Sequence, residues 1–183
     1  MPVPDFSPGE VLTAAAMDSI GLWKIAETTF STTATPFING CFSSNYQNYL
    51  VQFVVNGSGA GNLFYRMRSG VSTPETGAVY DRFGFFFSIG GAIVSLISSN
   101  TSAAFSSDIT AGGNSRTSGS LTIYSPNEST HTIVNSQTWD NSSGALYFPS
   151  HRIETTTQYT GIELTTLGGP TLTGTMRVYG YRN

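Results

Sequence analysis

The stretch FSSNYQNYLVQFVV, residues 42–55, indicates the fold of this chain. From Tyr49 onward its odd positions are Tyr49, Val51, Phe53 and Val55, an apolar row with a period of two that is rich in strand-forming residues. The even positions mix polar and apolar side chains. This pattern predicts a strand with one buried face and one partly buried face, as in a β-sandwich. The chain ends on a similar segment, TMRVYGY at residues 175–181, and we expect these two strands to lie in one sandwich.

The composition is that of an all-β protein. Charged residues make up only 10% of the 183 residues, against roughly a quarter in ordinary soluble domains. Serine and threonine, at 24 residues each, replace the missing charge, and aromatic residues are frequent enough to argue against disorder. The length fits one compact domain with an extension, and we expect a terminal segment at residues 1–21 and a β-domain at residues 22–183.

The charge pattern excludes several classes of partner. The net charge is −3 and the eight lysines and arginines are scattered singly, so no basic patch for nucleic acid is present. The longest apolar run, residues 83–97, is interrupted by glycine and serine and is too short for a membrane span. The N-terminus lacks the pattern of a signal peptide. No motif indicates a cofactor.

Cys41 is the only cysteine, which excludes an intramolecular disulfide and a cysteine-based metal site. We interpret it as a small buried residue beside the first core strand. An intermolecular disulfide is the alternative.

Residues 1–21 differ from the rest of the chain. Three prolines keep the start extended, and VLTAAAMDSI at residues 11–20 is the one segment that predicts a helix. A helix of about three turns with so few large apolar groups is not stable alone and needs a partner surface. We therefore interpret this segment as a docking element, whose candidate contact residues are Phe6, Val11, Leu12, Ala15, Met17 and Ile20.

From residue 22 onward, strand patterns follow one another between turn residues. The glycine-rich residues 56–61 predict an antiparallel hairpin between residues 42–55 and 62–68. Residues 79–88 and 92–99 predict a second hairpin, buried on both faces; the alternative of one interrupted helix conflicts with its β-branched residues and paired glycines. Residues 103–109 predict an edge strand, followed by a flexible loop at 111–118. The remaining predicted strands are 22–30, 119–125, 130–139, 145–155, 159–166 and 172–181.

Strands at this regular spacing predict an antiparallel β-sandwich of nine to eleven strands, jelly-roll-like in arrangement.

Four pieces of the chain resemble a known class of proteins. FSPGEVLTAAAM at residues 6–17 resembles the opening of many virion proteins of tailed bacteriophages. GLWKI at 21–25, FSSNYQNY at 42–49 and RVYGY at 177–181 are similar to recurrent pieces of short phage structural proteins, especially those of cyanophages and other marine phages. The resemblance covers about a quarter of the chain. It implies a virion component of the fibre, head-fibre or capsid-decoration type, with an N-terminal docking segment and an outward β-rich domain.

Catalytic chemistry finds little support in the sequence. His131 and His151 are the only histidines, and neither has a carboxylate and a nucleophile nearby along the chain. A glycosidase needs two carboxylates within roughly 5–10 Å of each other. Spacing alone leaves open such a pair among Asp81, Asp108, Asp140 and Glu154. We nevertheless expect a protein that is not an enzyme.

Carbohydrate binding is the alternative function. Trp139, Asp140, Asn141, Tyr147 and Tyr159 could place aromatic rings beside planar hydrogen-bonding groups, which is how proteins hold sugars. In that case the chain would be a module that recognises glycans on a host surface. The competing interpretation is that the tryptophan and the tyrosines belong to the core or to a subunit interface.

Self-association is the expectation that composition favours most. A surface with few charges and many apolar groups has little to keep it solvated and monomeric. Oligomerisation would bury part of that surface, and a homotrimer is what the resemblance implies. We therefore expect a non-enzymatic virion protein that binds copies of itself and other virion proteins of the capsid or tail. A capsid-cementing protein would differ only in its location on the particle.

Overall fold

The computed structural model describes residues 21–70, 73–109, 116–141 and 143–181, and in these ranges the chain is all-β. Eleven of its thirteen strands are five residues or longer. The strands are β1 (Leu22–Thr33), β2 (Phe37–Ile38), β3 (Asn48–Gly57), β4 (Gly61–Ser69), β5 (Thr73–Pro74), β6 (Tyr80–Phe87), β7 (Ile93–Thr101), β8 (Ala104–Ile109), β9 (Thr117–Tyr124), β10 (Thr132–Asp140), β11 (Ala145–Ile153), β12 (Gly161–Thr165) and β13 (Leu172–Tyr181). The predicted docking segment, including Phe6, Val11, Leu12, Ala15, Met17 and Ile20, lies outside the described residues.

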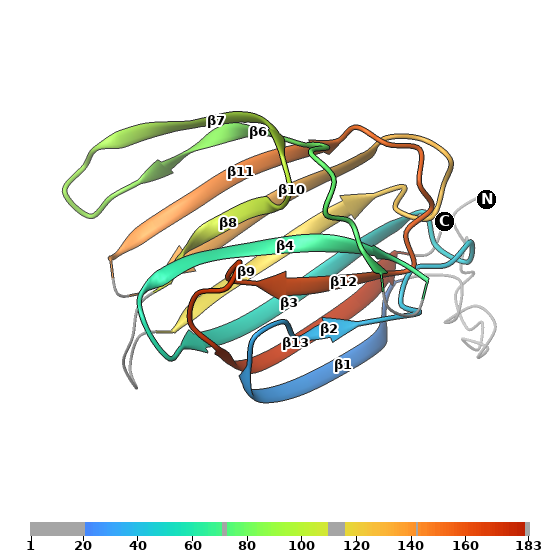
Figure 1. Ribbon diagram of the computed structural model, residues 1–183, viewed down its shortest axis with the longest axis horizontal. Helices are drawn as coiled ribbons and strands as arrows, with labels where there is room; N and C mark the ends of the chain where they lie inside the picture. Colours follow the sequence, from blue (N-terminus) through green and yellow to red (C-terminus); the bar gives the residue numbers. More distant parts are fainter. Residues whose placement is uncertain (1–20, 71–72, 110–115, 142, 182–183) are drawn as a thin grey trace, which may run out of the picture.

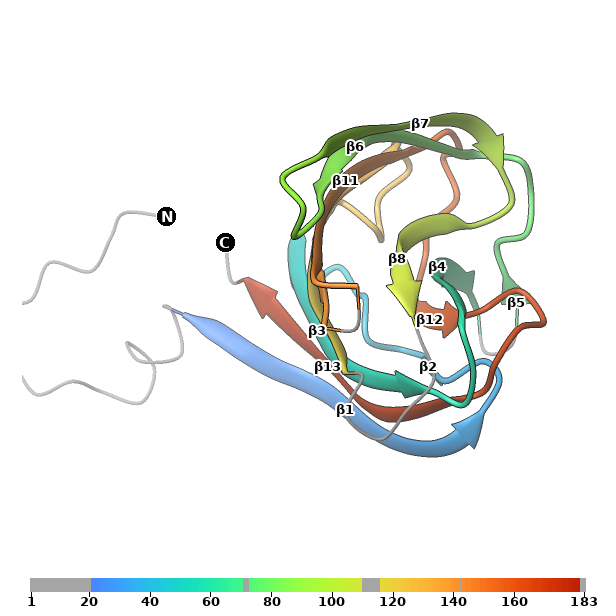
Figure 2. The ribbon, with the colours of Figure 1, turned by 90° about the vertical axis from the view of Figure 1, so that its left-hand side faces the viewer.

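The strands form two antiparallel sheets that pack face to face, which confirms the predicted β-sandwich. The large sheet has eight strands in the order β1-β13-β3-β9-β10-β11-β6-β7. The small sheet has the order β2-β12-β4-β5, and β8 pairs with β4. The large sheet curves around the small one, so that its inner face is covered and its outer face is open (Figures 1 and 2).

Strand β3 lies in the middle of the large sheet, as its sequence predicts. Its odd positions Tyr49, Val51, Phe53 and Val55 are all buried in the core between the sheets. The C-terminal strand β13 is its direct neighbour, with Val178 opposite Val51. The two segments that resemble each other in sequence therefore do lie in one sheet.

Strand β3 begins later than the sequence pattern suggests. Residues 42–47 form a turn that folds back on the strand, and Ser43 is held at both its N–H and its C=O by the Tyr49 hydroxyl, each at 2.7 Å. Cys41, just before this turn, is a free thiol buried in the core, and burial raises its pKa to about 12. Its position agrees with a structural role.

The predicted hairpin between β3 and β4 is wrong. Both edges of β3 are occupied, by β13 and β9, and β4 belongs to the small sheet. The glycine-rich segment instead crosses from one sheet to the other: the Ser58 N–H donates to Thr171 C=O at 2.9 Å, and a Cβ on Gly61 would come within 2.9 Å of Pro170. The glycines allow this close approach between the chain segments and do not form the turn of a β-hairpin.

The second predicted hairpin forms, but its predicted burial on both faces is wrong. Strands β6 and β7 pair from Phe87 opposite Ile93 to Tyr80 opposite Thr101. One face of the hairpin is open, because it belongs to the outer face of the large sheet, on the side away from the small sheet (Figure 2). The predicted edge strand at residues 103–109 is β8, which pairs only with β4. Most of the predicted loop after it lies outside the described residues, and Thr117 and Ser118 already belong to β9.

Candidate functional site

The open face of the β6–β7 hairpin carries a cluster of large apolar side chains. Strand alternation turns Phe83, Phe85 and Phe87 of β6 outward, while Arg82 and Phe86 turn inward. On the neighbouring strand β7, Ile93 and Ile97 are also outward, at 67% and 69% exposure. Three outward aromatic residues on one strand therefore face solvent beside two isoleucines.

The cluster continues across the sheet in register. Phe87 lies opposite Ile93 on one side and Leu146 on the other, and Leu146 lies opposite Trp139. This row crosses β7, β6, β11 and β10 without a charged residue. Eight outward apolar residues make up what we call the outer apolar patch: Phe83, Phe85, Phe87, Ile93, Ile97, Trp139, Leu146 and Phe148.

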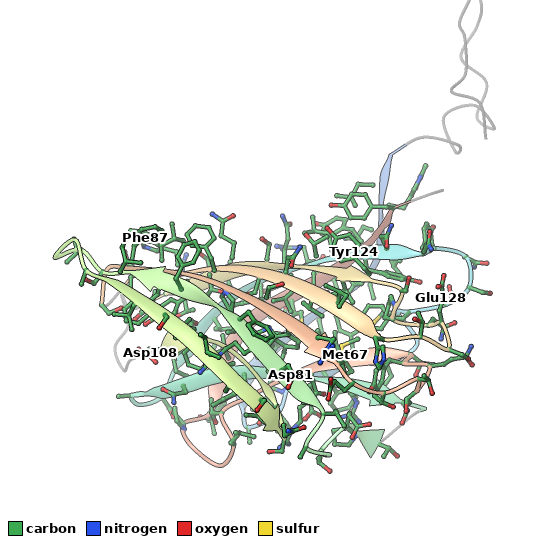
Figure 3. All side chains as sticks on the ribbon, turned by 90° about the horizontal axis from the view of Figure 1, so that it is seen from above. Met67, Asp81, Phe87, Asp108, Tyr124 and Glu128 are labelled. Carbon is green, nitrogen blue, oxygen red and sulfur yellow. The ribbon has the colours of Figure 1, made fainter. Side chains whose placement is uncertain are left out.

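The rings of the outer apolar patch contact one another. The centroids of Phe85 and Phe87 are 5.2 Å apart, and those of Phe85 and Phe148 are 5.6 Å apart. Edge and tilted contacts at such distances are favourable by about 0.5–1.5 kcal/mol for each pair. The patch is therefore a packed surface rather than a set of single exposed side chains. Figure 3 shows Phe87 and Tyr124 on this outer side of the large sheet and Asp108 on the other side.

A shallow hollow lies beside the patch on the same face. The outward residues of β9 in this region are Ser118 and Ser120, whose short side chains leave a depression of about 420 Å³. Trp139 and Leu146 border it on the patch side, and Arg177 lines it as well. The outer face thus offers large protruding rings next to a space that could receive apolar groups.

The charged residues of the outer face lie at its margins and are paired. At the β1 edge, Glu27 accepts hydrogen bonds from Lys24 at 3.0 Å and from Arg177 at 3.1 Å, and these bonds lower its pKa. At one corner, Arg152 donates to Asp81 at 3.0 Å, which lowers the pKa of Asp81. The middle of the face is electrically neutral.

The structure does not bring the predicted glycan-binding residues together. Trp139 is 42% exposed on the outer face, whereas Asp140, the next residue in the strand, is fully buried on the inner face and accepts a hydrogen bond from Ser143 at 2.6 Å. Asn141 is exposed in the turn that follows.

Tyr147 and Tyr159 are both buried, so neither faces solvent beside Trp139. The Tyr147 hydroxyl donates to Asp108 at 2.7 Å, and Tyr159 contributes to the core. These positions agree with the competing interpretation that the tyrosines are structural.

The two histidines have structural partners. His151 is buried, and its Nδ1 lies 2.8 Å from the Tyr65 hydroxyl. Burial, together with the nearby Arg82, lowers its pKa to about 3 and keeps it neutral. His131 is exposed, and its Nδ1 lies 3.3 Å from the Ile153 carbonyl oxygen.

The four candidate carboxylates are likewise engaged. Asp81 and Glu154 both pair with Arg152, while Asp108 and Asp140 accept hydrogen bonds from Tyr147 and Ser143. Within the described residues, no group of three or more histidines, cysteines or carboxylates is placed to hold a metal ion. The same residues include no helix with the length and hydropathy of a membrane span.

The chain matches no protein-family model and no curated protein. The geometry of the outer face is therefore the main basis for a functional proposal. Sequence reasoning missed this face because Phe85, Phe86 and Phe87 are consecutive, and an unbroken apolar run is the signal of a strand buried on both sides.

Proposed function

We propose that this protein is a non-enzymatic structural component of a bacteriophage virion, and that copies of it assemble through the outer apolar patch. The single observation that carries the proposal of assembly is the patch itself. It lies on an open sheet face, spans four strands and contains no charge.

The size of the patch lies at the upper end of what a monomer exposes and approaches that of a subunit interface. Aromatic side chains expose about 200 Å² each when fully open, so the exposed fractions in the patch correspond to roughly 600 Å². The largest apolar patch on a typical monomer is about 300–600 Å², and a standard interface buries about 800 Å² per partner. Burial of roughly 600 Å² at about 25 cal/mol/Å² provides a substantial driving force before the costs of association.

A second copy of the chain is the partner that the charge distribution favours. In a trimer with three-fold symmetry, the patch of one copy meets a different surface of the next copy. An uncharged patch can be buried there without leaving a charge unpaired, and the hollow beside it could receive the protruding rings of a neighbouring copy. A homotrimer, the state that the resemblance to phage proteins implies, is the assembly that we propose.

The proposal of a virion location rests on the resemblance of residues 6–17, 21–25, 42–49 and 177–181 to phage structural proteins. In this proposal residues 1–21 dock on other virion proteins, of the capsid or the tail, and the β-sandwich faces outward. The described sandwich contains its own core, which fits a domain that is attached through a separate segment.

The molar mass of the purified protein tests the assembly. Light scattering at micromolar concentration is expected to give about three times the 19.5 kDa of one chain. Replacing Phe83 and Ile97 together with lysine should shift the protein to monomers, because two charges would then be buried in the interface without partners.

Leu167→Lys provides the matched control. Leu167 is also an exposed large apolar residue, at 45%, but it lies in the loop between β12 and β13 and outside the patch. This variant should assemble like the wild type and give the same molar mass in light scattering. A monomeric wild type, or a double variant that assembles like the wild type, would exclude the proposed interface.

A further inference from the structure

A groove lies on the side of the molecule away from the outer apolar patch. Because the large sheet curves over at β6 and β7, the inner side of this hairpin overhangs β8 and the start of β4 (Figure 2). The space between them is about 500 Å³, within the range of roughly 300–1,000 Å³ that is typical of small-molecule sites. Its walls come from the two different sheets.

Aromatic rings form much of the wall of this groove. Phe64 of β4 and Phe105 of β8 contact each other edge to face, with centroids 5.7 Å apart. On the overhanging side, Phe86 stacks on Tyr147 at 5.0 Å. The half-buried rings of Phe64, Phe86 and Phe105 offer apolar surface to the C–H face of a sugar ring.

Arg82 lies in the groove without a carboxylate partner among the described residues. Its guanidinium lies 4.8 Å from the centroid of Phe105, and its Nε is buried with no hydrogen-bond acceptor. A buried donor without a partner is costly, and a guanidinium binds carboxylates well. Burial lowers the pKa of Arg82, which reflects an incompletely compensated charge. Arg82 can therefore donate a charge-assisted hydrogen bond to an anionic group that enters the groove.

The other polar groups of the groove suit hydroxyl groups. Asp108 and Asn62 are cross-strand neighbours on β8 and β4, and both line the groove. Asp108 accepts one hydrogen bond from Tyr147, and a carboxylate can accept several more. Ser98 adds a hydroxyl from β7. Asp108 repels a doubly charged phosphate in the groove more strongly than a singly charged carboxylate, and it can accept hydrogen bonds from several hydroxyls.

We propose that this groove binds an acidic saccharide, a sugar chain that contains uronic acid units. The uronate carboxylate accepts a hydrogen bond from Arg82, a sugar ring packs on the aromatic wall, and hydroxyls bond to Asp108 and Asn62. Of the set around Trp139 that the sequence suggested, this site includes only Tyr147.

Nuclear magnetic resonance titration of the full chain tests this inference. The probe is a trisaccharide of galacturonic acid, and the comparison ligand is the neutral galactose trisaccharide with the same linkage. We expect saturable shifts of amide signals in β8 and in the β6–β7 hairpin with the acidic probe, and much weaker binding of the neutral one. The absence of shifts with millimolar acidic probe, or equal binding of both sugars, would overturn the inference.

Two variants locate the contacts. Arg82→Gln should weaken binding by about tenfold or more, as expected for the loss of a charge-assisted hydrogen bond. Asn62→Ala, at an exposed position where folding is not at risk, should weaken it by a smaller factor. Arg152→Gln is the matched control, because Arg152 is a half-exposed cation on the outer face. If Arg152→Gln weakens binding as much as Arg82→Gln, or if both groove variants bind like the wild type, the groove is not the site.

Discussion

Arg68 and Glu163 form a buried ion pair on the side of the small sheet that faces away from the large one. Glu163 is almost inaccessible to solvent, and the guanidinium of Arg68 also bonds Asn39 at 2.9 Å and lies 4.4 Å from the centroid of Phe37. The pair is therefore enclosed by polar and aromatic partners. Replacing one residue of such a pair lowers the stability of the protein much more than replacing both residues with apolar ones.

We expect Arg68→Met to lower the free energy of unfolding by about 3 kcal/mol, because it leaves the Glu163 carboxylate buried without its close partner. The double variant Arg68→Met/Glu163→Leu should recover most of that loss. Urea denaturation of the two variants measures both values. A single variant as stable as the wild type would mean that Arg66, whose Nη1 lies 3.9 Å from Glu163, compensates fully.

His151 predicts a pH dependence of stability. Its pKa is about 3 in the folded protein because the side chain is buried, while an unfolded chain has a histidine pKa near roughly 6.5. Between these values the unfolded state binds a proton that the folded state does not. Stability should therefore be complete above about pH 6.5 and fall as the pH drops, by up to about 1.4 kcal/mol per pH unit.

The variant His151→Gln isolates this effect. Glutamine can still bond the Tyr65 hydroxyl but does not titrate, so urea midpoints of the variant should change little between about pH 6.5 and 5.5, where carboxylates remain largely ionised. Parallel pH profiles of the variant and the wild type would show that another group is responsible.

At the scale of single residues, the sequence predicted which residues are buried better than it predicted which residues lie close together. The alternation around Val51 and Phe53 gives their burial directly, and Cys41 was also predicted to be buried. The set around Trp139 was not assembled correctly, because Asp140 follows Trp139 in a strand and must point to the opposite face. Adjacent residues of a strand point to opposite faces of the sheet, so residues that are neighbours in sequence do not form one site.

At the scale of elements, Gly119 in β9 allows side chains of the neighbouring strands β3 and β10 to pack closely over it. It lies opposite Phe53 of β3, and a Cβ at this position would come within 2.5 Å of the Phe53 ring and 2.7 Å of the Thr138 hydroxyl. We expect Gly119→Val to displace the Phe53 ring from the core and to destabilise the protein by about 1–3 kcal/mol.

Ser120→Val is the comparison for that substitution. Ser120 is the next residue of the same strand and points to the outer face, so a larger side chain meets open space there. Its free energy of unfolding, measured by urea denaturation, should stay within about 0.5 kcal/mol of the wild-type value. Equal destabilisation by both substitutions would contradict the inward packing of Phe53 over Gly119.

The strands themselves were largely predictable, and their pairing only in part. β13 runs over residues 172–181 as predicted, and the β6–β7 hairpin forms around Gly90 and Gly91. The β3–β4 hairpin was wrong because a glycine-rich turn is a local signal, whereas the neighbours of β3 are set by strands more than 60 residues away. The groove near Arg82 was not predictable for the same reason, since its walls come from five strands, β4, β6, β7, β8 and β11.

At the scale of the whole molecule, the sandwich described here holds its core residues between residues 30 and 178. Deleting residues 2–20 should therefore leave a folded, soluble domain with an unchanged urea midpoint. The deleted chain should no longer join virions, which mass spectrometry of purified particles measures. Normal incorporation of the shortened chain would refute the docking role that we propose for residues 1–21.

Assembly through the outer apolar patch is the central claim, and hydroxyl-radical footprinting tests it on the unmodified protein. The reaction oxidises exposed aromatic and aliphatic side chains, so it reports whether a surface is covered. At micromolar concentration we expect Phe83, Ile97 and Trp139 to be protected relative to a sample diluted until it is monomeric. Phe37 and Leu167, which are exposed outside the patch, should react equally in both samples. Oxidation of Phe83 and Ile97 at the same rate in both samples would contradict the account.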